Sequence, residues 1–152
     1  MHTDFILQTR GPGLTDFTGS VAEWLTEVGA ADGLLTLFVR HTSCSLLIQE
    51  NADPDVRTDL AAFFNRLVPS ADEPLMGYLT HTIEGPDDMP AHIKAALLPV
   101  SLSIPVMNGQ MRLGTWQGIY LFEHREGTHK RQVAAQFLKG WGNCPESPKQ
   151  MR

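Results

Sequence analysis

The chain has 152 residues with a formal net charge of −5, enough for one compact domain with its own hydrophobic core. Charged residues make up 19% and hydrophobic residues 42% of the sequence, a balance that excludes a wholly disordered chain. The acidic balance predicts no nucleic-acid partner, because a duplex-binding module presents a basic face, but it leaves room for a small anionic metabolite. The longest apolar run, residues 60–64, predicts no membrane helix. Two cysteines and no visible secretory signal predict a reducing cytoplasm.

The first half of the chain alternates strand and helix signals. Residues 5–9 are compatible with a short strand, and an apolar spacing of three to four residues predicts a helix over 17–28. Residues 34–39 and 44–49 are rich in β-favouring side chains and predict two strands. Asp53 and Pro54 then have the residue types of a helix cap and first turn, so we expect a helix from residue 54 to the proline at 69.

The second half begins with a polar loop and is otherwise mostly β. Residues 70–90 have loop chemistry, and a short helix is expected over 91–98. Asn108-Gly109 lies between two alternating apolar segments, which predicts a hairpin. Two further strands are expected over 119–124 and 131–138, followed by a polar tail over 141–152. We therefore predict an α+β fold with mainly antiparallel strands, in which residues 1–140 form one domain and 141–152 a flexible tail.

Histidines stand at the ends of predicted elements that lie far apart in the sequence. His41 ends a strand, His81 lies in the polar loop, and His92 lies in the first turn of the following helix. Imidazoles from separate segments are typical of a metal or acid–base site assembled in three dimensions. Taken singly, each is more often an ordinary exposed or hydrogen-bonded histidine.

Other polar residues gather in the same regions, each with two interpretations. Asn51 and Asp53 precede a helix, where they bind a phosphate or simply cap the helix. Glu84 and Asp88 lie in or beside the loop, as cation ligands or as solvated turn residues. The segment 114–118 places Trp116 between two glycines, as a ligand-stacking corner or a core residue at a bend. Cys44 and its neighbouring serines lack the spacing of a nucleophile elbow, which disfavours a serine or cysteine hydrolase.

Five separated motifs, in order, resemble the YjbQ family. They are His41-Thr42-Ser43-Cys44-Ser45-Leu46, Glu50 to Arg57, His81 with Glu84-Gly85, Ala91-His92-Ile93-Lys94, and Leu113 to Ile119. The resemblance covers residues 3 to 140, nearly the whole chain. It implies a single domain of two packed β-sheets with about three helices, assembled as a homotrimer whose sheets meet around the threefold axis.

The resemblance also implies a divalent metal, zinc in particular, held by His41, His81 and His92. Glu84 and Lys94 are candidate catalytic groups by the same resemblance, and Asp88 joins them as a candidate base for a metal-activated hydrolase. A further set would line the pocket and bind substrate: Asn51, Asp53, Arg112, Thr115, Trp116 and Gln117. His124 follows Glu123 where many relatives carry another residue, so it stays outside the predicted ligand set.

The activity implied by the resemblance is that of a thiamine-phosphate synthase, which joins a pyrimidine-methyl diphosphate to a thiazole phosphate and releases pyrophosphate. Magnesium commonly assists the departure of a diphosphate, whereas three imidazoles favour zinc. The sequence therefore leaves two alternatives open: a zinc-dependent hydrolase of a small phosphorylated or cyclic metabolite, and a trimeric protein that binds a metal or anion without turnover.

Overall fold

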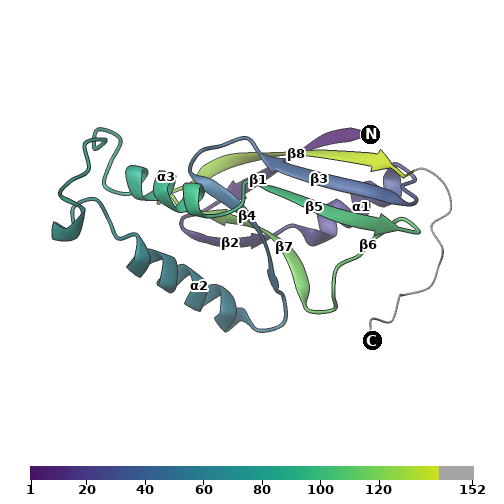
Figure 1. The fold of residues 1–152 in the computed structure, drawn as a ribbon, viewed down its shortest axis with the longest axis horizontal. Coiled ribbons are helices and arrows are strands. Elements are labelled where there is room, and N and C mark those ends of the chain that lie inside the picture. Colours follow the sequence, from purple (N-terminus) through teal and green to yellow (C-terminus); the bar gives the residue numbers. More distant parts are fainter. Residues whose placement is uncertain (141–152) are drawn as a thin grey trace, which may run out of the picture.

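The computed structural model describes residues 1–140, which form two packed antiparallel sheets with three α-helices (Figure 1). The larger sheet has the strand order β1-β8-β3-β5-β6, and the smaller has the order β2-β7-β4. This confirms the predicted α+β sandwich. The predicted tail, 141–152, lies outside the described residues.

Five strands make the larger sheet: β1 His2–Thr9, β8 His129–Lys139, β3 Gly33–Val39, β5 Ser101–Met107 and β6 Gln110–Met111. Along β3, Leu35, Leu37 and Val39 are buried while the residues between them are more exposed, so one face of the sheet points into the core. The hairpin between β5 and β6 is formed by Asn108 and Gly109, whose φ angles are +51° and +75°. These are the positive angles for which an Asn-Gly pair is suited.

Three strands make the smaller sheet: β2 Gly13–Asp16, β7 Gln117–Glu123 and β4 Cys44–Glu50. β7 is the central strand, and Gly118 to Glu123 are all buried. β2 was not predicted, because four residues carry too little alternation to stand out. It forms through its pairing with the last four residues of β7.

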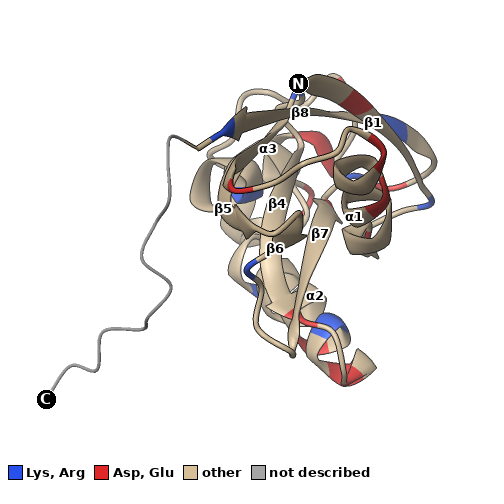
Figure 2. Ribbon diagram, turned by 90° about the vertical axis from the view of Figure 1, so that its right-hand side faces the viewer, with Lys and Arg blue, Asp and Glu red and all other residues tan. Residues whose placement is uncertain are grey.

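The helices cover different sides of this sandwich. α1, Thr18–Glu27, lies beside the two sheets and buries Val21, Trp24 and Leu25 (Figure 2). α2, Pro54–Leu67, and α3, Asp88–Leu97, lie next to the smaller sheet, with the short 3₁₀ turn η1, Pro74–Met76, between them (Figure 1). Phe64 of α2 contacts Phe122 of β7 edge to face, with ring centroids 5.7 Å apart. None of the helices in the described part of the chain is long and apolar enough to cross a membrane.

Candidate metal centre

Two histidines and one aspartate meet at the first turns of α3. Asp88 and His92 are one helical turn apart on α3, and His81 reaches them from the loop that precedes the helix. Their candidate ligand atoms all lie within 4.8 Å of one another. The Nε2 atoms of His81 and His92 lie 2.8 Å and 3.3 Å from the same oxygen, Asp88 Oδ2.

The loop reaches α3 through a tight reversal at Glu84-Gly85-Pro86. Gly85 adopts φ +107°, a conformation that side-chain-bearing residues rarely take. Asp88 follows immediately in the first turn of α3, where the backbone N–H groups favour a carboxylate. The helix begins at Asp88, three residues before the expected start, so the carboxylate and His92 share one helix face.

The orientation of His92 is set by the backbone. Its Nδ1 lies 2.9 Å from the carbonyl oxygen of Thr42, and a carbonyl can only accept a hydrogen bond. Nδ1 therefore carries the proton, and in the neutral ring the lone pair of Nε2 points at Asp88 Oδ2. A lone pair facing a carboxylate oxygen at 3.3 Å requires a positive charge between them, either a second proton or a metal ion.

The distances fit a metal ion. Two ligands bonded to one ion at about 2.05 Å lie about 3.3 Å apart in a tetrahedral site and about 2.9 Å apart in an octahedral one. The observed separations of 3.3 Å and 2.8 Å are close to these values, and 2.8 Å is also the length of a hydrogen bond between His81 and Asp88. A backbone carbonyl that orients a ligating imidazole is also the usual support of such sites.

Arg125 binds two neighbouring carboxylates, those of Asp87 and Asp88. Its guanidinium donates to Asp88 Oδ1 through Nη1, to Asp87 Oδ2 through Nε at 2.8 Å, and to the Glu84 carbonyl through Nη2 at 3.1 Å. Burial alone would raise the pKa of Asp87, but the hydrogen bonds from Arg125 and from the Glu126 backbone lower it. Arg125 thus neutralises one charge of the pair and fixes Asp88 with Oδ2 facing the imidazoles.

The structure does not bring His41 into this cluster. Its Nε2 accepts the backbone N–H of Gln132 on β8 at 2.8 Å, which turns the ring toward the larger sheet. Burial, and then the nearby charge of Arg131, lower its pKa. The expected set of three imidazoles is therefore corrected to two imidazoles and the carboxylate of Asp88, which was predicted as a catalytic group instead.

The other two predicted catalytic groups also lie apart from the imidazoles. The side chain of Glu84 is exposed, and only its backbone carbonyl contacts Arg125. Lys94 is on a different side of α3 and donates to Asn65 Oδ1 at 2.7 Å.

The predicted substrate-binding residues lie at the far end of the smaller sheet. The β4–β7 ladder ends with the pair Cys44 and Glu123 on the side of the His81–Asp88–His92 cluster, and with the pair Glu50 and Gln117 on the other side. Seven residues of strand span about 20 Å, so within one chain Asn51, Thr115 and Trp116 do not line the centre.

Local hydrogen bonds explain most of these residues structurally. Asp53 accepts the N–H of Asp55 at 2.9 Å and caps α2. Gln117 Oε1 accepts the N–H of Gly114 at 2.7 Å, and the side-chain amide of Asn51 contacts the carbonyl of Gln117 at 3.4 Å. Arg112 is exposed and contacts the sulfur of Met107. Trp116 stays exposed, at 66% of its surface, so it is not the core residue of the alternative interpretation.

Sequence reasoning missed a buried polar layer beneath the centre. Glu123 and Arg131 form a two-pronged ion pair with N···O distances of 2.6 Å and 2.5 Å, and both side chains are buried. His124 Nε2 lies 2.9 Å from Ser45 Oγ. Partners on different strands leave no local pattern in the sequence, and of these two strands only β8 alternates between buried and more exposed residues. Cys44, expected to be a buried small residue, is fully buried, and burial raises the pKa of its thiol to about 12.

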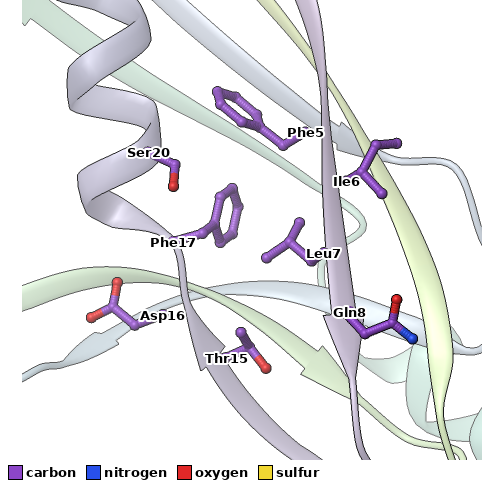
Figure 3. A pocket seen from close by; sticks show the side chains of 8 residues that line it. All are labelled: Phe5, Ile6, Leu7, Gln8, Thr15, Asp16, Phe17 and Ser20. Carbon is purple, nitrogen blue, oxygen red and sulfur yellow. The ribbon is translucent and has the colours of Figure 1, made fainter.

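A separate hollow lies between β1, β2 and α1, where Phe5, Leu7 and Phe17 form the apolar wall (Figure 3). Its carboxylate, Asp16, caps α1 by accepting from the N–H and hydroxyl of Thr18. This hollow has no set of convergent titratable groups and offers no comparable chemistry.

Comparisons with known proteins give one consistent result. The family model described as UPF0047 protein YjbQ-like matches residues 3–140. A UPF0047 protein of Synechocystis is 50% identical over 128 residues, covering 84% of each chain. The UPF0047 protein YjbQ of Escherichia coli is 48% identical over 130 residues, covering 85% of this chain and 91% of the relative.

Solved structures agree on the fold. A hypothetical protein from Aeropyrum pernix superposes with a TM-score of 0.81 at 30% identity, covering 92% of this chain and 99% of that one. An uncharacterized conserved protein of the YjbQ/UPF0047 family from Clostridium acetobutylicum gives 0.78 at 33% identity, covering 90% and 99%.

These relatives overturn the predicted reaction. They are described as UPF0047 proteins, as hypothetical or as uncharacterized, and none is described as a thiamine-phosphate synthase. The synthase activity implied by the resemblance is therefore wrong as an assignment for this chain, and the site must be interpreted from its own geometry.

Proposed function

The chain belongs to the UPF0047 YjbQ-like family, and from the geometry of its own residues we propose that it is a metal-dependent enzyme. His81, Asp88 and His92 bind one divalent transition-metal ion, zinc by preference. The observation that carries the proposal is the convergence of two Nε2 atoms on Asp88 Oδ2, with the proton of His92 held on Nδ1 by Thr42.

The donor set decides between ions. Two imidazoles and one carboxylate suit zinc and other late transition metals, whereas magnesium prefers oxygen ligands and water. Magnesium was a second candidate from the sequence, and the replacement of one imidazole by Asp88 does not restore an oxygen-rich site.

Three protein ligands leave at least one coordination position open. An ion bound in this way lowers the pKa of a bound water and polarises a bound oxygen. The chain's own residues supply the rest: Thr42 orients His92, and Arg125 fixes Asp88 while balancing the charge of Asp87. His81 is 46% exposed at its side chain, which leaves the centre open to a ligand from solvent.

The test is metal analysis of purified protein with matched histidine variants. Wild-type protein, stripped with a chelator and reloaded with zinc or cobalt(II), should retain about one ion per chain, as three protein donors would hold it. His81→Gln and His92→Gln should each lose it, and His41→Gln should keep it. The cobalt(II) absorption spectrum should report nitrogen and oxygen ligands in wild type and in His41→Gln. Retention by His92→Gln, or equal loss in His41→Gln, would refute the ligand set.

We also propose that the chain self-associates through the outer face of the larger sheet, in line with the expected trimer. Ile6, Leu34, Phe38 and Leu138 share this face and are 40% to 53% exposed. Exposed apolar side chains grouped on one face favour an interface. Light scattering should find an oligomer for wild type, a smaller species for Phe38→Ser, and no change for Phe63→Ser, an equally exposed phenylalanine on α2. A monomeric wild type would contradict this proposal.

A reducing cytoplasm, predicted from the cysteine count, is kept as part of the proposal. The free and fully buried thiol of Cys44 supports it, since a protein of an oxidising compartment commonly pairs such residues.

A further inference from the structure

A second polar pocket lies on another side of α3. It is half open to solvent, has a volume of about 220 Å³, and is lined by residues of α3, the C-terminal part of α2, the end of β7 and adjoining loops. Successive residues of an α-helix are 100° apart, so Lys94 is turned about 200° from His92 around α3. The pocket therefore uses none of the three proposed metal ligands.

Lys94 is the cation of this pocket. Its side chain is 94% buried by the fold, leaving 6% exposed, and its Nζ donates one hydrogen bond, to Asn65 Oδ1 at 2.7 Å. An ammonium group has three donors, and a buried one is normally matched by an acceptor or a negative charge. Among residues 1–140, no carboxylate lies within salt-bridge distance of Lys94.

His124 also lines this pocket, and one nitrogen of its ring is unpaired. The residue is 3% exposed, and its Nδ1 is the one buried side-chain nitrogen or oxygen in the described chain without a hydrogen-bond partner. Its Nε2 is engaged by Ser45 Oγ at 2.9 Å. Buried polar atoms of native proteins are almost always paired, so an unpaired nitrogen in a residue that lines a pocket points to a partner that the protein itself does not supply.

Two acidic residues, Asp87 and Glu126, line the pocket together with Lys94. Asp87 Oδ2 already accepts from the Arg125 guanidinium and from the Glu126 backbone N–H, so its charge is balanced. The side chain of Glu126 is exposed and lies at the rim. Among the residues that line the pocket, Lys94 is the one cation, and His124 carries the unpaired ring nitrogen.

We propose that this pocket binds the oxyanion group, carboxylate or phosphate, of a small metabolite through Lys94 Nζ and His124 Nδ1. The pocket, with a volume of about 220 Å³, has room for one such group with a short carbon chain. It is smaller than the pockets of about 300 Å³ or more that hold drug-sized ligands.

The proposal fixes the tautomer of His124. An oxyanion accepts hydrogen bonds, so Nδ1 must carry the proton, and Ser45 Oγ must then donate to Nε2. Burial, and then the charge of Lys94, lower the pKa of His124 to about 4, so the ring is neutral near pH 7 and has one proton to place. Neutral histidines in water mostly carry that proton on Nε2. A proton on Nδ1 of His124 would therefore differ from the usual tautomer and can be recognised by NMR.

The experiment titrates inorganic phosphate and, separately, acetate into metal-stripped protein in the presence of a chelator, so that no ion can bind the probe. Calorimetry should show saturable binding of at least one probe, and the stronger one identifies the class of oxyanion. Lys94→Met, which keeps the packed stem, should weaken this binding at least tenfold. His124→Phe should also weaken it. Lys139→Met, with the same charge change at the far end of β8, should bind as wild type does.

Nitrogen-15 NMR of the histidine rings supplies a readout that does not depend on the variants folding. In wild type, probe binding should leave the proton of His124 on Nδ1 and shift that nitrogen. Absence of saturable binding of either probe, or binding unaffected in folded Lys94→Met, would overturn the proposal, and so would a His124 signal that does not respond. Because metal retention is measured on separate, metal-loaded samples, its failure and the failure of this proposal are distinguishable.

Discussion

Replacing Arg131 with methionine should destabilise the protein severely, because it leaves a buried carboxylate without its counterion. Glu123 is 0% and Arg131 5% exposed. The carboxylate accepts two hydrogen bonds from Arg131, one from Thr9 Oγ1 at 2.7 Å and two from the backbone N–H groups of His124 and Arg125. Breaking one partner of a buried pair costs about 3–5 kcal/mol, and the three neutral donors that remain place the expected loss near the lower end, about 3 kcal/mol.

The pH dependence of this loss has a definite sign. Burial would raise the pKa of Glu123, but the hydrogen bonds from Arg131, Arg125 and Thr9 lower it in the folded wild type. Its contribution to stability is therefore present above the unfolded pKa of about 4.3 and is lost as the pH falls through the lower folded value. Without Arg131, burial prevails and raises the pKa, so the variant's carboxyl protonates first and the gap between the two proteins narrows toward acid.

Urea unfolding at fixed protein concentration measures both effects, with the fluorescence of buried Trp24 as a probe. Wild type and Arg131→Met should differ by about 3 kcal/mol at pH 7 and by less at pH 4.5. Lys130→Met, an exposed neighbour on the same strand, should stay within about 0.5 kcal/mol of wild type. A loss below about 1 kcal/mol, or a gap that widens on acidification, would refute the reasoning.

Three further predictions test the fold and the limits of the site. Gly33→Ala should unfold the protein or lower its stability by several kcal/mol in thermal melts, since a Cβ there would lie 2.2 Å from the Leu138 carbonyl oxygen. The control variant Gly19→Ala places its Cβ in open space and should raise the stability by about 0.5 kcal/mol. In a Cys144→Ser background, Cys44 should resist thiol reagents at pH 8 until urea is added, because its pKa is about 12; rapid labelling of the native protein would contradict its burial. Gln117→Ala should cost about 1 kcal/mol through the lost bond to Gly114 and leave metal retention unchanged, and a loss of metal would place this corner at the centre after all.

Local signals in the sequence predicted the local structure well. Asp53 caps α2, Pro54 is its first residue, and Asn108-Gly109 forms the β5–β6 turn, as expected. These features could be predicted because a cap or a turn depends on only a few neighbouring residues. The expected start of α3, residue 91, is three residues too late, because the helix begins at Asp88 and Pro90 is its third residue. A proline is tolerated anywhere in the first helical turn, so it marks a start only to within a turn.

The candidate site was predictable only in part, for a related reason. His81 and His92 lie close together in sequence and were placed in the same site. His41 looked equally suitable from the sequence. It does not join the cluster because its Nε2 accepts a hydrogen bond from the backbone N–H of Gln132, which is 91 residues away in the chain. The ion pair of Glu123 and Arg131 joins strands by packing, which residue types alone do not specify. Asp88 was recognised as chemically relevant, but its role depends on Arg125, which orients one oxygen and leaves the other free.

α3 gives this part of the molecule two chemically different walls. One side of the helix presents Asp88 and His92, which suit a cation, and another presents Lys94, which suits an anion. Arg125 links the two sides, because its guanidinium donates to both Asp87 and Asp88. It is also the residue that follows His124 after the end of β7. The Glu123–Arg131 pair anchors that end through the backbone N–H groups of His124 and Arg125. A change at the buried pair would therefore disturb both walls together, whereas a change at His92 or at Lys94 should disturb only one.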